Sequence, residues 1–370
     1  MCAFQAHLSR RDFLRLAALG LGGLAFQPLE RRMFLPDFPQ AERLGRVTIG
    51  KVELKARPDP DSSTLGVLYE DAVLPWLREI SGRQPYYVFS NQRWVETPQG
   101  YIYGPYFQPV YNRPNTPVNE LPVSSRGPGM WVEITVPYAD VQLERDPSSN
   151  SWVKNKLDDG LPLRVYYSQT FWVDQVKPSR FGGMLYRINP NYYGGVDMLW
   201  VAAEACRPID SAELAVINPD VMEKRIVVDV THQTLACYEG RSEVYFCRVS
   251  TGAKFDMYGN VVDAWATPVG IHRVTRKFVS LQMAGGTTGA GYDLPGIAWT
   301  SIFATGGVAI HSTFWHNNYG DPVSHGCVNC SSEDAKWIWR WSMPAVVYDP
   351  GMLDVTVSGE DSTRVDVVEE

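Results

Sequence analysis

Three of the six histidines of this chain lie close to one cysteine. His311 and His316 precede the segment Ser324-His325-Gly326-Cys327. A thiol nucleophile needs a partner that favours the thiolate, because free cysteine titrates near pH ~8.5 and histidine near ~6.5. An ion pair of the thiolate with an imidazolium would supply that stabilisation. His325 is only two residues from Cys327, so local geometry can direct its ring away from the sulfur. His311, expected at a strand end, can return across the loop 312–323 and is the preferred base, whereas His316 is either a pocket wall, a substrate contact or an alternative base.

Cys330 creates the spacing Cys327-x-x-Cys330 and leaves three interpretations open. It is either a buried thiol at the start of the next helix, which we favour, or the disulfide partner of Cys327, or one ligand of a zinc site that also uses Cys327 and His311 or His316. Three other cysteines lie in apolar, strand-like segments and are expected in the core, with a disulfide across a hairpin possible between the last two: Cys206, Cys237 and Cys247.

The segments around this cluster have the composition of short strands. Alternation over 224–230 and 234–240 predicts a β-hairpin. Further strands are predicted over the ranges 244–250, 270–274, 298–303, 307–311, 345–348 and 363–368. One helix is predicted over Ser332–Trp341, because Ser331 and Asp334 have the spacing of a capping box. This half of the chain is therefore expected to be mainly β.

Two smaller β modules are predicted upstream. Residues 46–110 follow a Pro-containing linker at 27–45 and contain five short strand-like runs, which suggest a small barrel: 46–54, 66–69, 72–77, 86–89 and 94–95. A second linker at 111–129 is rich in Pro and Gly, and 130–210 is a second aromatic-rich module with strand composition. Its aromatic residues either bind glycan or, as we favour, fill a thin core.

The first 26 residues have the layout of an export signal. Paired Arg10 and Arg11 are followed by an apolar run from Leu16 to Phe26, which is too short to span a bilayer as a helix. The pair resembles a twin-arginine signal, so the protein is expected in the cell envelope, at the outer face of the cytoplasmic membrane or in the periplasm. A net charge of -7 without a long basic run argues against nucleic acid as a partner.

The motif around Cys327 resembles the signature of the YkuD-type L,D-transpeptidases: a histidine, a loop, then Ser-His-Gly-Cys, an apolar residue and Asn or Arg. The resemblance covers residues 222–349 and extends to three upstream segments, 249–252, 267–270 and 293–299. Residues 46–110 resemble a bacterial SH3-type domain, through segments at 52–58, 63–66, 93–95 and 100–102. The implied fold is a mainly β protein in which a β-sandwich catalytic domain follows one or two small SH3-like barrels, with a C-terminal strand and acidic tail at 350–370.

The resemblance also implies the chemistry. Cys327 would form a thioester with a peptidoglycan stem peptide and release D-alanine, and a second stem would then give a 3-to-3 cross-link. His311 would be the base, oriented by Ser312, while backbone N–H groups of His325, Gly326 and Cys327 would face the oxyanion. Ser324 and Asn329 would brace the loop. Trp315, His316, Tyr292 and Met283 are candidate substrate contacts, as is Trp299. An aromatic core would explain Tyr292, Met283 and Trp299 nearly as well. No metal or organic cofactor is implied, and carbapenems are expected inhibitors.

Two other functions stay open at this point. Water in place of the acceptor amine would make the protein an L,D-carboxypeptidase. A decayed or zinc-bound site would leave a non-catalytic wall-binding protein, although the intact His311 and Ser324–Cys327 set argues against decay.

Overall fold

The computed structural model describes residues 33–85, 90–125, 127–145, 148–194, 197–255, 260–261, 263–285, 292–358 and 361–369 of the 370-residue chain. Within these ranges no helix is both long and apolar enough to cross a membrane. The expected signal segment lies outside the described residues. Strands dominate the three units of the molecule, which confirms the mainly β prediction.

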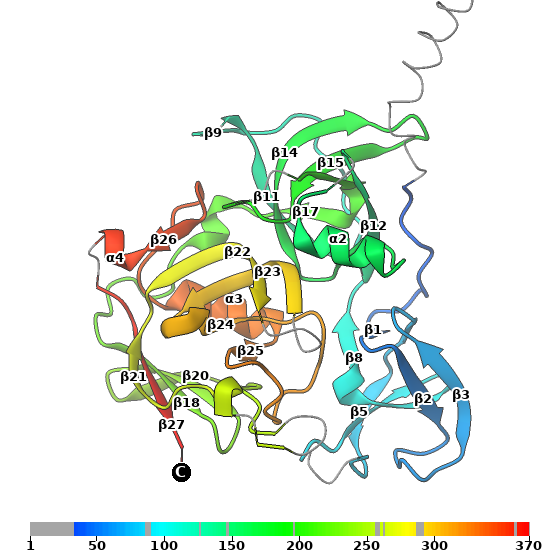
Figure 1. Ribbon diagram of the computed structural model, residues 1–370, viewed down its shortest axis with the longest axis horizontal. Coiled ribbons are helices and arrows are strands. Elements are labelled where there is room, and N and C mark those ends of the chain that lie inside the picture. Colours follow the sequence, from blue (N-terminus) through cyan, green and yellow to red (C-terminus); the bar gives the residue numbers. More distant parts are fainter. Residues whose placement is uncertain are drawn as a thin grey trace, which may run out of the picture.

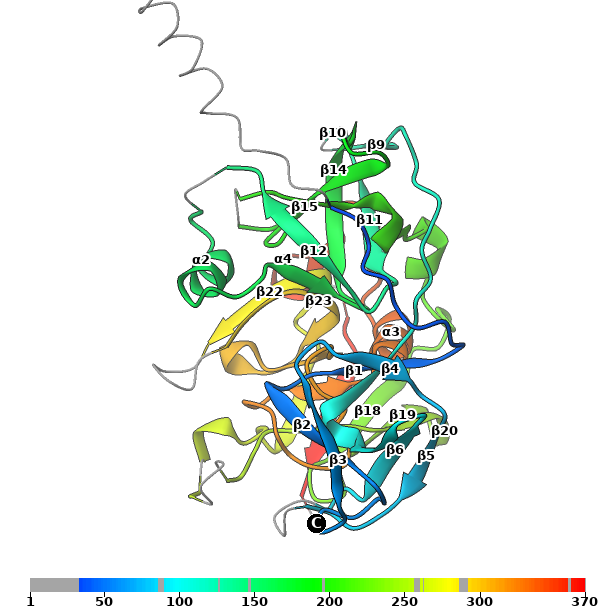
Figure 2. The same ribbon diagram turned by 90° about the vertical axis from the view of Figure 1, so that its right-hand side faces the viewer.

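The N-terminal module is built from two small sheets (Figure 2). The larger has the order β3-β2-β7-β6-β5, from Thr64–Tyr69, Lys51–Lys55, Gly100–Tyr103, Arg93–Thr97 and Arg78–Ser81. The smaller has the order β4-β1-β8, from Val73–Pro75, Leu44–Val47 and Phe107–Val110. Trp76 and Phe107 stack in the core of this module, with ring centroids 5.6 Å apart. A strand expected at 86–89 lies outside the described residues.

The second module is one seven-stranded sheet of order β13-β12-β16-β15-β14-β11-β17. Its strands are Arg164–Tyr166, Tyr138–Leu143, Leu199–Ala202, Met184–Asn189, Thr170–Pro178, Met130–Ile134 and Cys206–Pro208. A short ribbon, β9 (Val123–Ser124) with β10 (Gly127–Pro128), precedes it. Helix α2 (Ser151–Asp158) was not predicted, since it is short and mostly polar; only Trp152 and Val153 are buried. Its start is fixed by the Asn150 side chain, which accepts the Val153 N–H.

The third unit is a sandwich of two five-stranded sheets. One has the order β20-β19-β18-β27-β21, from Ser242–Arg248, Thr234–Glu239, Lys224–Asp229, Arg364–Val368 and Gly270–Arg273. The other has the order β25-β24-β23-β22-β26, from Val328–Cys330, Ala309–Ser312, Tyr292–Ile302, Arg276–Gly285 and Met352–Asp354. Residues of both sheets share one hydrophobic core.

Two features of the C-terminal region differ from the sequence-based expectation. The segment 345–348 is not a strand: Tyr348 instead accepts the Trp131 Nε1–H on its carbonyl oxygen at 2.8 Å, and the Trp131 N–H on its hydroxyl at 2.9 Å. Its apolar composition serves packing against the second module rather than a sheet ladder. Strand β27 was expected in a C-terminal segment, 350–370, that follows the catalytic domain. It instead pairs in parallel with β18 inside the first sheet of the sandwich.

Helix α3 (Ser332–Trp341) has the predicted bounds, and the Ser331 hydroxyl accepts the Asp334 N–H. Buried Lys277 of β22 reaches the other end of the helix. Its ammonium donates to the carbonyl oxygens of Trp339, Ser342 and Pro344 at 2.6, 2.7 and 2.9 Å. Carbonyl groups at a helix C-terminus have no hydrogen-bond donor within the helix, so Lys277 supplies the missing donors.

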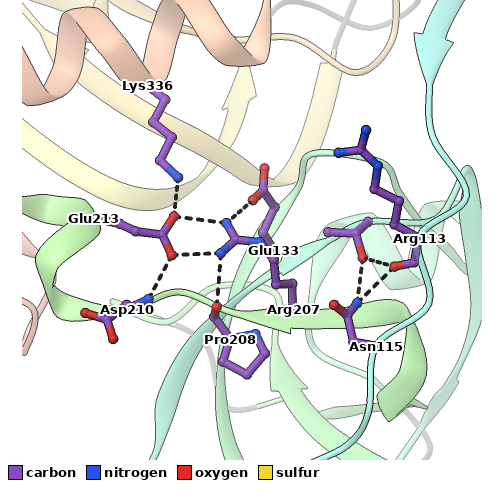
Figure 3. A network of polar contacts seen from close by, with 9 residues as sticks. Arg113, Asn115, Glu133, Arg207, Pro208, Asp210, Glu213 and Lys336 are labelled. Atoms are coloured by element: carbon purple, nitrogen blue, oxygen red, sulfur yellow. Dashed lines mark hydrogen bonds and ion pairs between the residues drawn. The ribbon is translucent and has the colours of Figure 1, made fainter. Parts of the chain in front are cut away.

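A polar network ties α3 to the second module (Figure 3). Arg207 of β17 donates to Glu133 of β11 and to Glu213, and Lys336 of α3 donates to Glu213. Burial favours the neutral form of Glu213, but the hydrogen bonds from Arg207 and Lys336 outweigh it and lower its pKa to about 2. Helix α3, which follows β25, is thus anchored to the preceding module.

Candidate active site

His311 and Cys327 line one pocket beside two parallel strands. Strand β24 carries His311, and β25 begins directly after Cys327, with His311 in register with Asn329. The crossover 313–327 joins the two strands, so a parallel pairing that the sequence motif cannot show brings His311 and Cys327 to the same pocket. Both line a pocket of about 440 Å³.

The backbone of its own neighbour fixes the His311 tautomer. Nδ1 of His311 lies 2.9 Å from the Ser312 carbonyl oxygen, which can only accept, so the proton of the neutral ring is on Nδ1 and Nε2 keeps its lone pair. Burial lowers the pKa of His311 to about 4, although the bond to Ser312 acts in the opposite direction. His311 is therefore a neutral acceptor at physiological pH.

His316 has both ring nitrogens engaged. The Asn318 N–H donates to Nδ1 at 3.0 Å, so the neutral ring carries its proton on Nε2. The side-chain amide of Asn329 lies 2.9 Å from this Nε2, and the two groups are complementary when Asn329 presents its oxygen. Burial, together with neighbouring His311 and Arg93, lowers the pKa of His316 to about 3. These contacts favour a wall role for His316 over that of base.

The Ser-His-Gly-Cys turn is held by hydrogen bonds of its first residue. The Ser324 hydroxyl donates to the Cys327 carbonyl oxygen at 2.6 Å and accepts the Gly326 N–H at 3.1 Å. Gly326 has φ of 115°, which a side chain would strain. Because its N–H already donates to Ser324, Gly326 does not offer the oxyanion donor that was expected of it.

Two upstream segments brace this turn, although no role in the site was predicted for them. The Thr267 hydroxyl donates to the Gly326 carbonyl oxygen at 2.8 Å and accepts the Gly252 N–H at 2.9 Å. A Cβ at Gly252 would lie 1.9 Å from the Trp265 carbonyl oxygen, so this close approach requires glycine. Ser250 and Asn329 exchange two backbone hydrogen bonds of 2.8 and 3.0 Å. The signal for these residues was present in the segments 249–252 and 267–270.

Nine of the predicted site residues line the pocket: Met283, Tyr292, His311, Trp315, His316, Ser324, His325, Cys327 and Asn329. The exposed ring of His325 lies against Trp265 and Tyr292, with centroids 4.3 and 5.3 Å away. Asp293, Leu294, Ile297 and Val323 complete the lining and were not predicted individually. Trp299 lies elsewhere, in the hydrophobic core against Trp339.

The thiol and the imidazole are both neutral in the free pocket. Burial raises the pKa of Cys327 to about 11, while the backbone of Ala309 acts in the opposite direction. With His311 at about 4, transfer of the thiol proton would create two poorly solvated charges. The thiolate–imidazolium pair expected from the sequence is therefore disfavoured until a substrate is attacked.

Cys330 and Cys327 have different surroundings. Cys330 is fully buried in the core between the sheets, where a hydrogen bond with Cys247 and burial raise its thiol pKa well above the ordinary value. All five cysteines of the described residues are free, so neither a Cys327–Cys330 nor a Cys237–Cys247 disulfide is formed. Among the described residues no group of three or more His, Cys, Asp or Glu is placed to hold a metal ion. The buried-thiol interpretation of Cys330 fits best.

Comparison with known proteins gives the class of this domain. Residues 223–367 match the sequence model of the YkuD family, described as the L,D-transpeptidase catalytic domain. The segment that matches this family model includes every residue of the pocket described above. No curated protein matches the chain.

Solved structures with similarity to the chain include three L,D-transpeptidases. An Enterococcus faecium enzyme is 20% identical, with 40% of this chain and 51% of that chain covered and a TM-score of 0.29. An enzyme from Mycobacterium smegmatis is 18% identical (53% and 98% covered, TM-score 0.31), and LdtMt1 in complex with imipenem is 16% identical (53% and 98%, TM-score 0.30). The chain spans about half the length of the enterococcal structure.

Proposed function

We propose that this protein is a peptidoglycan L,D-transpeptidase with Cys327 as its nucleophile. The observation that carries the proposal is the pocket that Cys327 and His311 share beside β24 and β25. In it, the hydrogen bond to the Ser312 carbonyl leaves His311 Nε2 with its lone pair to accept a proton. A neutral base with its lone pair free is what a buried thiol needs for attack on an amide.

In the first half-reaction, Cys327 Sγ attacks the carbonyl carbon between the third stem residue and D-alanine. His311 Nε2 takes the thiol proton as the S–C bond forms, since neither charge is stable in the free pocket. The N–H groups of Cys327 and His325 stabilise the oxyanion. The C–N bond then breaks, His311 returns the proton to the leaving amine, and D-alanine departs from a thioester.

In the second half-reaction, the amine of another stem peptide attacks the thioester carbon. His311 accepts a proton from this amine and returns it to the thiol as the C–S bond breaks, which gives a 3-to-3 cross-link. Stem peptides are reached outside the cytoplasm, so the proposal includes export to the cell envelope, for which the paired arginines at the N-terminus are the supporting feature.

Intact-mass analysis of the full chain with a stem tetrapeptide tests this function. We expect a thioester adduct, D-alanine release and a cross-linked dimer of stems. Cys327→Ala should lose all three, whereas Cys330→Ala, which removes a thiol in the core outside the pocket, should keep most activity. D-alanine release by Cys327→Ala would contradict the nucleophile assignment. Release without any cross-linked product would instead identify a carboxypeptidase.

A further inference from the structure

The crossover 313–327 contacts the N-terminal module as well as its own domain. In Figure 1 this orange loop extends to β8 and the neighbouring strands of that module. The Asn317 N–H donates to the Pro105 carbonyl oxygen at 2.9 Å, and its side-chain amide donates to the carbonyl oxygens of Gly104 and Phe107, both at 3.2 Å. Arg93 donates to the Asn317 carbonyl oxygen. Asn317 is therefore surrounded by backbone and side-chain groups of the other module.

A buried carboxylate marks the second contact point. Asp321 is only 2% exposed. Its carboxylate accepts the N–H and the hydroxyl of Ser90, both at 2.7 Å, and the N–H of Asn91 at 3.2 Å. A buried carboxylate is costly unless hydrogen bonds compensate it, and these donors come from the N-terminal module. The loop thus needs the module to satisfy its own polar groups.

From Asn91 a continuous chain of hydrogen bonds leads to β25. Its side-chain amide donates to the Asn318 side-chain oxygen at 3.1 Å and to the Tyr319 carbonyl oxygen at 3.2 Å. The Asn318 N–H in turn donates to His316 Nδ1 at 3.0 Å, and His316 Nε2 lies 2.9 Å from the Asn329 amide. His316 lines the pocket, and Asn329 lies in β25, in register with His311.

The other side of the loop is held in the same way. Arg46 of β1 donates to the Phe314 carbonyl oxygen. The Phe314 ring stacks on Tyr166 of the second module, with centroids 5.6 Å apart and planes at 14°. Trp315, which follows Phe314 and lines the pocket, is therefore flanked by contacts to both preceding modules.

We propose that Ser90 and Asn91 of the N-terminal module are positioning residues of the active site, which hold the crossover so that Trp315 and His316 form one wall of the Cys327 pocket. The inference rests on the proposed function for its catalytic consequence only. The module then acts as part of the catalytic machinery, beyond any binding or spacing role. Loosening the loop displaces the pocket wall and admits water to His311.

The experiment uses the full chain and three variants. Asn91→Asp keeps the side-chain oxygen that accepts from Arg93 N–H and Nε–H but cannot donate to Asn318 or Tyr319. Ser90→Ala removes one donor to Asp321. The matched control is Asn115→Ala, which also removes an amide that bonds to another unit, the Thr135 hydroxyl at 2.7 Å, but does so away from the crossover. Each is measured for carbapenem acylation, hydrogen exchange at amides 314–321, and alkylation of Cys327 by iodoacetamide against pH.

We expect Asn91→Asp to acylate roughly 10- to 100-fold more slowly, the scale of a misplaced reacting group, with the loss in the acylation step. Exchange at 314–321 should accelerate. The pH midpoint of Cys327 alkylation should fall from about 11 toward the ordinary thiol value, because water that enters past the loosened wall solvates the thiolate. Ser90→Ala should change in the same direction by less, and Asn115→Ala should match the wild type. A shift of this midpoint distinguishes positioning from simple loss of stability.

Unchanged acylation in Asn91→Asp would overturn the proposal, whether or not exchange accelerates, and so would equal losses in Asn115→Ala. If the wild-type protein does not react with a carbapenem, the proposed function fails. Exchange and alkylation still decide the positioning role in that case, because neither requires the transpeptidase reaction: unchanged values in Asn91→Asp would overturn it.

Discussion

The carbonyl oxygen of Ser312 lies 2.9 Å from Nδ1 of the adjacent His311 and determines which nitrogen of that ring carries the proton. No side chain is needed for this orientation. Ser312 is 2% exposed, and it pairs in register with Cys330 of β25, so the carbonyl group is rigidly placed by the sheet. Replacement of the Ser312 side chain alone would leave the tautomer of His311 intact.

Replacing His311 by Gln should reduce the rate of carbapenem acylation by ~100-fold or more, because a positioned base is lost. His316→Gln should have the smaller effect, since Nδ1 and Nε2 of His316 already contact Asn318 and Asn329. The measurement is the rate of adduct formation by mass spectrometry. If His316→Gln is inactive while His311→Gln is fully active, His316 and not His311 is the base.

The pKa of His311 sets the pH dependence of acylation. Burial lowers it from 6.5 to about 4, so the neutral base is present above about pH 4. The rate should fall as pH drops through about 4 and stay level from there to neutrality. Folding stability should also fall between about pH 6.5 and 4, because the unfolded chain binds this proton first. An acid limit near 6.5, seen in acylation rates from pH 3 to 8, would contradict the burial of His311.

Removing the Thr267 hydroxyl should slow acylation without touching the pocket lining. Thr267→Val leaves the Gly252 N–H and the Gly326 carbonyl without the partner that now joins them, and we expect a loss of roughly 10-fold from the displaced Cys327 turn. Thr267→Ser keeps the hydroxyl and is the matched control, which should retain most of the rate. Equal losses in both variants would contradict this explanation, because Thr267→Ser keeps both hydrogen bonds.

Lys277→Met should destabilise the catalytic domain by about 2–4 kcal/mol, the range for stranding several buried polar groups. Three carbonyl oxygens at the end of α3 would lose their donor. Chemical denaturation measures the change. The exposed Lys154→Met on α2 is the control and should stay within about 0.5 kcal/mol of the wild type. A similar stability for both variants would show that water replaces the Lys277 ammonium.

Local sequence patterns determined the elements that depend on nearby residues. The helix over Ser332–Trp341 was predictable from Ser331, whose hydroxyl caps the Asp334 N–H within one turn. The hairpin of β18 and β19 followed from alternation of apolar residues over adjacent segments. The catalytic candidates were found for the same reason, because Ser324 to Cys327 form a contiguous motif and His311 lies a short loop away.

Tertiary structure alone decided the relations between distant residues. Nothing local to Asp321 indicates that Ser90 and Asn91, more than two hundred positions away, satisfy its carboxylate. The charge state of Cys327 and His311 also depends on burial by the whole sandwich: the sequence suggested an ion pair, whereas loss of solvent favours the neutral pair. Residues 345–348 have the composition of a strand, but the hydroxyl and carbonyl oxygens of Tyr348 accept hydrogen bonds from Trp131 of another module. Composition reports the preference of a segment, and long-range packing decides which partners its hydrogen-bonding groups meet.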